Sequence, residues 1–159
     1  DVNPYAAASF YAVDRFASYQ KFWKQAYETG SVILADRYTT SNLIYQLPKL
    51  PRREWGSFTE WPLAYEYHRL ALPIPDMTIF LDMPVSMSES LLTKRYSGDE
   101  TQKDIHEKDE AFQDGCHEAA LYAAEKLGWV CISCHVKGSL KTPEQIHQEL
   151  LLAIEKAFL

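Results

Sequence analysis

An acid and a base stand next to each other directly behind an apolar stretch of this chain. Asp36 and Arg37 follow the segment SVILA (residues 31–35), and hydroxyl and amide side chains come after them in ILADRYTTSN. A carboxylate there can orient the water shell of a magnesium ion, and a guanidinium can form paired hydrogen bonds with phosphate oxygens. On the dipeptide alone, a solvated ion pair at the end of a strand remains the simpler interpretation.

A second candidate site lies on the first predicted helix. Tyr11 and Arg15 are one turn apart in FYAVDRF and therefore project from the same helix face. An aromatic ring can stack on a base while a guanidinium donates to the acceptor edge of that base. Asn42 and Gln46 repeat the step of four, and their amides could bond to the same ligand. The alternative is a helix that packs its aromatic residues into the core and leaves Arg15 exposed.

The elements that must position these residues alternate between helix and strand. Helical spacing of apolar residues extends over residues 5–29, and Gly30 is a typical C-terminal stop. We expect three strands, each apolar throughout, at residues 31–35, 75–84 and 130–134. Such strands, separated by helices, indicate an α/β fold with a parallel sheet that has helices on both faces. Ligands bind beyond the carboxyl ends of such strands, where Asp36 and Arg37 would then stand.

Composition limits the class of protein. The chain has 159 residues, of which 47% are hydrophobic and 24% charged, as expected for one globular domain over residues 1–159. The net charge of −6 argues against nucleic-acid and anionic-membrane partners. No apolar run is long enough to span a membrane and no signal peptide is recognisable, which favours the cytoplasm. The three cysteines are therefore expected to be reduced, and CISCH favours a buried strand over a zinc or redox site.

The order of several motifs resembles the thymidylate kinases, which phosphorylate dTMP from ATP. The resemblance covers about residues 3–158 and rests on YAVDR, VILADRYTTSNLIYQ, LPIPDMTIFLDMP, LLTKRY and DIHEKD, in that order. Single short motifs are weak signals, but their order makes the resemblance specific. It implies a P-loop-kinase-like parallel sheet with helices on both faces, and a homodimer that associates through helices.

The resemblance also implies roles for the candidate residues. Tyr11 would stack on the thymine and Arg15 would contact its exocyclic oxygen. Arg37 would hold the dTMP phosphate, and Asp36 would act with Mg²⁺ as a catalytic and metal-binding residue. Ser41, Asn42 and Gln46 would complete the substrate pocket.

A lid over the phosphates is implied for about residues 97–110. Lys94 and Arg95 end the helix before it, and Arg95 is the candidate catalytic lid residue. Asp104 stands where many bacterial members carry an arginine. Lys94, Arg95 or Lys103 would therefore have to supply the positive charge of the lid.

The sequence departs from the family in one respect. It contains no G-x-x-x-x-G-K-[ST] motif and only 6 glycines, so no loop of that kind is present to cradle ATP. We therefore expect the chain to be the C-terminal part of a longer protein and to be inactive alone, whereas the complete protein forms dTDP from dTMP and Mg²⁺-bound ATP. A non-catalytic thymidylate-kinase-like paralogue and a deoxynucleoside kinase remain alternatives.

Overall fold

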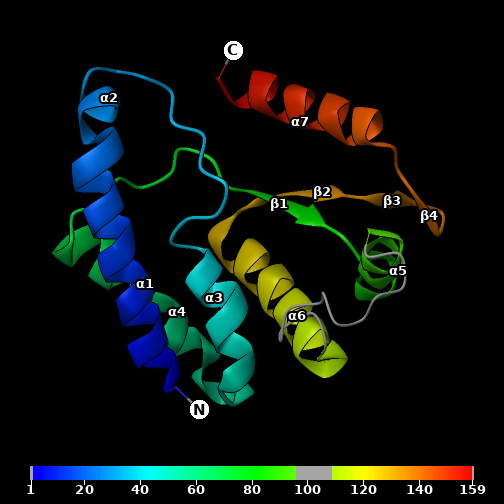
Figure 1. Ribbon diagram of the computed structural model, residues 1–159, viewed down its shortest axis with the longest axis horizontal. Coiled ribbons are helices and arrows are strands. Elements are labelled where there is room, and N and C mark those ends of the chain that lie inside the picture. The colour runs from blue at the N-terminus through cyan, green and yellow to red at the C-terminus, as the bar shows by residue number, and fades with distance from the viewer. Residues whose placement is uncertain (1, 96–108, 159) are drawn as a thin grey trace. The chain divides into compact units, whose positions relative to one another are not determined.

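The structure of this chain is a computed structural model that describes residues 2–95 and 109–158 (Figure 1). The chain divides into two compact units, unit 1 over residues 1–75 and unit 2 over residues 76–159. Unit 1 is helical, whereas unit 2 combines helices with a parallel pair of strands. Each unit is therefore described by itself.

Unit 1 begins with a long helical segment. It consists of α1 (Pro4–Ser18), a π-helical turn η1 (Tyr19–Trp23) and α2 (Lys24–Glu28). The Asn3 side chain caps its start by accepting a hydrogen bond from the Tyr5 backbone N–H at 2.8 Å. Gly30 follows its end with a φ of 89°, a conformation that glycine adopts readily. The helix predicted for residues 5–29 is confirmed, but its periodicity gave no sign of the π-helical turn.

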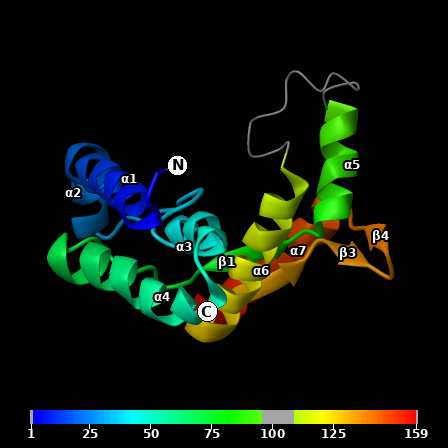
Figure 2. The ribbon, with the colours of Figure 1, turned by 90° about the horizontal axis from the view of Figure 1, so that it is seen from below.

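The rest of unit 1 is built from shorter helices. They are α3 (Ser41–Gln46), η2 (Leu47–Lys49), η3 (Arg52–Glu54), α4 (Trp55–Leu63) and the π-helical turn η4 (Ala64–Arg69). The helices α1, α3 and α4 contact one another (Figure 2). Phe58, Leu43 and Leu47 are fully buried among them, and the ring of Phe58 lies 4.9 Å from that of Tyr5. Burial of each such side chain contributes about 1.5 to 3 kcal/mol, so this cluster fixes the three helices together.

The structure has no strand at residues 31–35, where the sequence predicts one. Val32 is 96% exposed and Leu34 is 95% exposed, and none of the residues described in the two units pairs with this segment in a sheet. A strand forms only where a neighbour accepts its backbone hydrogen bonds, and an apolar pattern cannot replace that neighbour. The prediction was therefore wrong here, and Asp36 and Arg37 lie in a bend of a loop instead of at a strand end.

Unit 2 contains the parallel pair of strands. β1 (Ile79–Asp82) pairs in parallel with β2 (Val130–Ser133), with Ile79 opposite Val130 and Asp82 opposite Ser133. The connection between them contains α5 (Val85–Arg95) and α6 (Glu110–Leu127). In Figures 1 and 2, α6 lies on one side of the strand pair and α7 (Pro143–Phe158) on the other. The predicted α/β arrangement is thus present in unit 2, with two of the three expected strands.

Local signals define the ends of the unit 2 helices. Gly128 ends α6 with a φ of 69°. A reciprocal cap begins α7, because the Thr142 N–H donates to Gln145 Oε1 at 2.8 Å and the Gln145 N–H donates to Thr142 Oγ1 at 3.3 Å. The strands β3 (His135–Val136) and β4 (Ser139–Leu140) form a short antiparallel hairpin before this cap.

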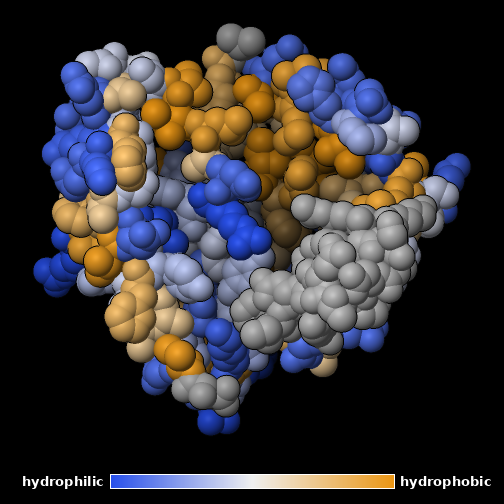
Figure 3. Space-filling model, in the orientation of Figure 1, coloured by the Kyte–Doolittle hydropathy of each residue, from blue (hydrophilic) through white to orange (hydrophobic). Residues whose placement is uncertain are grey.

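Unit 2 leaves apolar side chains uncovered between α7 and the strand pair. Figure 3 shows hydrophobic residues gathered in this region. Leu81 of β1 is 45% exposed and Leu152 of α7 is 63% exposed. Helix α7 has no buried residue, so its apolar side chains shield the strands only in part.

Candidate functional site

A buried carboxylate joins two of the predicted site residues in unit 1. Glu66 lies in the π-helical turn η4 and is fully buried. Arg15 of α1 donates from Nε to Glu66 Oε2 at 2.6 Å and from Nη2 to Oε1 at 2.7 Å. Asn42 of α3 donates from Nδ2 to the same Oε1 at 2.9 Å. Three segments that are distant in the sequence therefore meet at one carboxylate group.

Small residues on α1 allow α3 to pack against the backbone of α1. Ala8 and Ala12 are buried, and the Asn42 amide donates a second hydrogen bond to the Ala8 carbonyl oxygen at 3.2 Å. Asn42 is consequently only 2% exposed, yet both of its N–H groups are satisfied. The position of Asn42 is thus fixed from α1 as well as from η4.

The ion pair between Arg15 and Glu66 is well shielded from solvent. The Arg15 side chain is 16% exposed and that of Glu66 is 0% exposed. Two hydrogen bonds between charged groups are strong and fix the plane of the guanidinium. Burial of such a pair nevertheless costs about as much desolvation energy as the attraction returns, so apolar residues would often stabilise a core equally well. A buried pair of this kind is therefore a candidate for a functional role.

The other predicted base-site residues surround this cluster on α1 and α3. Tyr11 is one turn before Arg15 and is 58% exposed, so it does not belong to the core. Its ring offers the flat surface that stacking requires. Ser41 is the first residue of α3 and is half-buried. Gln46 ends α3, is 2% exposed and accepts a hydrogen bond from Lys49 Nζ at 3.1 Å.

The backbone of Arg37 is strained. Its φ is 66°, a left-handed conformation that a residue with a Cβ atom rarely adopts, and such strain gathers at functional sites. The guanidinium lies over the ring of Tyr45, 5.1 Å from the ring centroid. Asp36 precedes it in the same bend, and both side chains are exposed. An acid and a base are therefore presented to solvent together, as the sequence suggested, but by a strained loop.

The loop that contains Arg37 is anchored directly behind it. The Tyr38 hydroxyl donates to the Pro73 carbonyl oxygen at 3.1 Å, and the Thr39 hydroxyl is hydrogen-bonded to the Tyr67 hydroxyl. Burial raises the pKa of Tyr38 far above its ordinary value, and the neighbouring Tyr67 and Glu66 add to that rise. Tyr38 therefore stays protonated at neutral pH and remains a hydrogen-bond donor. Arg37 is thus held by a fixed backbone.

The described residues could hold a magnesium ion only together with phosphate oxygens of a bound substrate. Among residues 2–95 and 109–158, no group of three or more His, Cys, Asp and Glu side chains could hold a metal ion. Mg²⁺ at phosphate-transfer sites commonly takes one or two carboxylates and completes its shell with water and phosphate oxygens. Asp36 can provide one such carboxylate, so the predicted metal role requires phosphate ligands as well.

Unit 2 contains the predicted lid residues. Lys94 and Arg95 are in the last turn of α5. Lys103 and residues 97–108 of the predicted lid lie outside the described residues, whereas Asp109 and Glu110 form the start of α6. At the carboxyl end of β1, Asp82 Oδ1 lies 2.6 Å from His117 Nε2 of α6, a pair that sequence reasoning missed.

Sequence reasoning also missed Glu66. The acid stands between two tyrosines in AYEYHRLAL, and an acid flanked by aromatic residues in a helical segment is the signal that could have identified it. Tyr45 was missed as well, although it lies between the two predicted amides of α3. Its contact with Arg37 depends on a loop conformation that no pattern in the sequence predicts.

No helix in the part of the chain that the structure describes has the length and hydrophobicity needed to cross a membrane.

Comparisons with known proteins give a consistent result. Residues 1–150 match the family model described as thymidylate kinase. The chain is 29% identical over 154 residues to a protein of Thermococcus onnurineus (strain NA1) named probable thymidylate kinase, covering 97% of the chain and 66% of that protein. It is 27% identical over 154 residues to a protein of Synechococcus sp. (strain WH7803) named thymidylate kinase, covering 96% and 64%. A protein of Limosilactobacillus fermentum with the same name is 32% identical over 127 residues, covering 79% and 56%. The matched part of the chain therefore spans between 56% and 66% of the length of these relatives.

Proposed function

This chain belongs to the thymidylate kinase family, and on that basis we propose that the complete protein transfers the terminal phosphate of ATP to dTMP, forming dTDP. Family membership confirms the resemblance found in the sequence. The proposal concerns the complete protein because the 159 residues contain no G-x-x-x-x-G-K-[ST] motif that would cradle the phosphates of ATP.

One observation supports this proposal above the others: Arg15 and Asn42, which the sequence singled out separately, are both bonded to Glu66 Oε1. Their side chains are therefore neighbours, as they must be if they contact one base. Tyr11, exposed one turn away from Arg15 on α1, adds a stacking surface. In this proposal Ser41 and Gln46 complete the dTMP pocket from the two ends of α3.

The phosphate of dTMP is assigned to the strained loop. Arg37 would grip its oxygens with a guanidinium that Tyr45 and the anchored backbone hold in place. Asp36 would help to hold Mg²⁺, which when bound offsets the negative charge of the phosphates. Phosphoryl transfer needs little covalent chemistry from the protein, so these residues would act by positioning and by electrostatic stabilisation. Arg95, with Lys94 and Lys103, would add positive charge from the lid.

An assay of substrate preference tests the proposal. The complete protein is incubated with ATP, Mg²⁺ and one of dTMP, dUMP, AMP or thymidine, and ADP release is followed by a coupled assay. We expect the highest kcat/KM with dTMP. Preference for thymidine would instead indicate a deoxynucleoside kinase, and preference for AMP would indicate another monophosphate kinase. Binding of dTMP without turnover would indicate a non-catalytic paralogue.

A further inference from the structure

We propose that Glu66 determines which base the site accepts, by fixing the hydrogen-bond polarity of Arg15 and Asn42. With Glu66 bonded to both, Arg15 presents a donor and Asn42 presents an acceptor side by side. A base edge with a carbonyl oxygen next to an N–H group, as in thymine or uracil, matches this pattern. The inference rests on the proposed function, because it assumes that the site binds a pyrimidine monophosphate.

The orientation of the Asn42 amide follows from its two partners. Both are oxygen acceptors, Glu66 Oε1 at 2.9 Å and the Ala8 carbonyl oxygen at 3.2 Å. If the amide turned over, Asn42 Oδ1 would face these two oxygens with no hydrogen between them, at a nearly buried position. The carboxylate therefore holds both N–H groups of Asn42 inward. Its Oδ1 accepts no hydrogen bond from the residues that the structure describes, and in this proposal that oxygen is assigned to the base of the ligand.

The orientation of Arg15 is fixed by the same carboxylate. Its Nε and Nη2 each donate one hydrogen bond to Glu66. Five N–H groups belong to a guanidinium, so among the described residues Nη1 and the second N–H of Nη2 have no hydrogen-bond acceptor and remain as donors. Arg15 Nη2 and Asn42 Nδ2 bond to the same oxygen of Glu66, so the two side chains are adjacent. The proposal assigns the unused donors of Arg15 and the unused acceptor of Asn42 to neighbouring groups of one base.

This arrangement distinguishes between pyrimidines. Thymine and uracil have the O4 acceptor next to the N3–H donor, which matches donors on Arg15 and an acceptor on Asn42. Cytosine has an N4 amino donor next to the N3 acceptor, so each of its groups would meet a group of the same kind. The site as built would therefore reject dCMP through unpaired polar groups rather than through shape.

The location of Glu66 agrees with a role beyond stability. It lies in a π-helical turn, and such turns are frequent at functional sites. Its carboxylate is fully buried, so it cannot contact a ligand directly. Glu66 is therefore a positioning residue that acts through Arg15 and Asn42.

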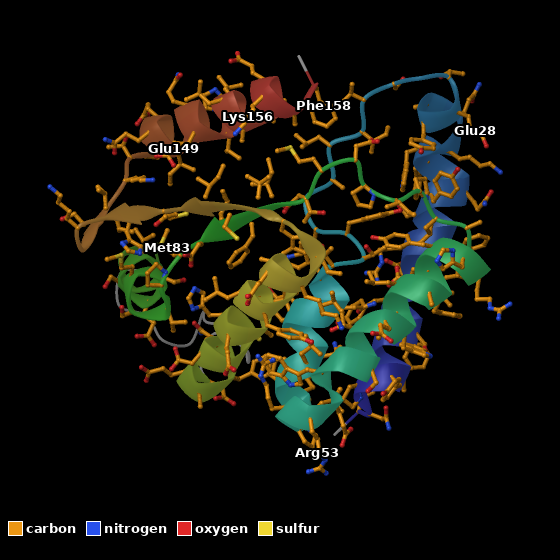
Figure 4. The ribbon with its side chains drawn as sticks, turned by 180° about the vertical axis from the view of Figure 1, so that it is seen from behind. Glu28, Arg53, Met83, Glu149, Lys156 and Phe158 are labelled. Carbon is orange, nitrogen blue, oxygen red and sulfur yellow. The ribbon has the colours of Figure 1, made fainter. Side chains whose placement is uncertain are left out.

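The experiment compares dTMP and dCMP in the complete protein. Binding constants are measured by calorimetric titration for wild type, Glu66→Gln and Glu28→Gln, with melting temperatures recorded alongside. Glu66→Gln keeps the size of the side chain but replaces one acceptor oxygen by a donor, so Asn42 is free to turn over. Glu28 is a matched control because it is a glutamate at the end of α2 (Figure 4), and its ion pair with Lys24, at 3.9 Å, is exposed.

We expect wild type and Glu28→Gln to prefer dTMP over dCMP by the same factor. In Glu66→Gln this preference should fall by roughly tenfold or more, because one specific base contact contributes a discrimination of that order. If Glu66→Gln folds and weakens binding of both nucleotides in equal proportion, Glu66 only stabilises the fold and the inference is overturned.

A second variant tests the polarity should Glu66→Gln fail to fold. Asn42→Ala keeps the pair between Arg15 and Glu66 but removes the acceptor. The affinity for dTMP should then fall by roughly tenfold while that for dCMP does not fall, because only dTMP uses this acceptor. Unchanged dTMP affinity would overturn the inference. Wild-type protein that binds neither nucleotide would refute the proposed function itself, and the inference with it.

Discussion

Replacement of Arg15 by alanine should destabilise unit 1 strongly. The substitution removes both hydrogen bonds that Arg15 donates to Glu66, at 2.6 and 2.7 Å, and leaves a fully buried carboxylate without its counter-charge. Breaking a buried ion pair from one side costs about 3 to 5 kcal/mol. Because Asn42 still donates to Oε1 of Glu66, we expect a value near the lower end, about 3 kcal/mol.

The loss can be measured by thermal and urea denaturation of the complete protein. For a chain of this size, about 1 kcal/mol shifts the melting temperature by roughly 2 to 4 °C, so a decrease of roughly 6 to 12 °C is expected. Adding Glu66→Gln to Arg15→Ala should restore part of the stability, because no uncompensated charge is then buried. Lys24→Ala is the control: it removes an exposed hydrogen bond to Gln20 Oε1 at 3.4 Å and the exposed ion pair with Glu28 at 3.9 Å, and such an ion pair contributes about 0.3 to 0.5 kcal/mol.

Two results would refute this reasoning. One is an Arg15→Ala protein as stable as the Lys24→Ala control. This would mean that water reaches the Glu66 carboxylate and stabilises its charge in place of Arg15. The other is a double variant no more stable than Arg15→Ala alone, which would mean that the cost does not arise from the buried charge. In either case, loss of dTMP affinity in Arg15→Ala should be measured at a temperature where the variant is folded.

Three further predictions concern the loop that contains Asp36 and Arg37, the first helix, and the thiol of Cys131. Asp36→Asn and Arg37→Lys should each lower kcat by about a hundredfold or more at an unchanged melting temperature, since one preorganised charged contact contributes about 3 kcal/mol to the transition state; near-normal turnover would exclude the residue from catalysis. Phe10 on α1 is 74% exposed, and we expect it to be covered in a homodimer, so light scattering should give twice the monomer mass for wild type and the monomer mass for Phe10→Glu; a monomeric wild type would contradict this. Burial, and then the charge of Asp82, raises the pKa of the Cys131 thiol above its ordinary value of 9.0. Cys131 is therefore protonated at neutral pH, and the rate of its alkylation by iodoacetamide should still be rising with pH at pH 9 instead of levelling off there. Asp82→Asn should shift that profile to lower pH; a shift to higher pH would show that the charge of Asp82 is not a cause.

Local features of this protein could be predicted from the sequence because they depend on neighbours along the chain. The first helix and its end at Gly30 were recognisable in this way. The left-handed cap at Gly128 and the reciprocal cap of Thr142 and Gln145 likewise depend only on residues that are close in the sequence. The strand β2 was predicted within one residue because a short apolar run next to a glycine stop has few alternatives. Order and spacing of the motifs also indicated the family that the comparisons then showed.

The segment at residues 31–35 shows where such prediction fails. Its apolar residues are as typical of a strand as those of β1, yet β1 pairs with β2 whereas residues 31–35 pair with no strand in the described parts of the chain. A strand is defined by its hydrogen-bond partner, and that partner is distant in the sequence. The strained φ of Arg37 likewise depends on a loop that Tyr38 and Thr39 anchor from outside it.

The sequence by itself determined that Tyr11 and Arg15 share one helix face and that Asn42 and Gln46 are also a step of four apart, because helical spacing depends only on order along the chain. Only the tertiary structure placed Glu66 between Arg15 and Asn42. An acid in a helix is equally compatible with solvent and with a buried pair, and burial depends on which helices pack over it. The residues that could contact a base were thus visible in the sequence, whereas the carboxylate that orients them was visible only once α1, α3 and η4 had come together.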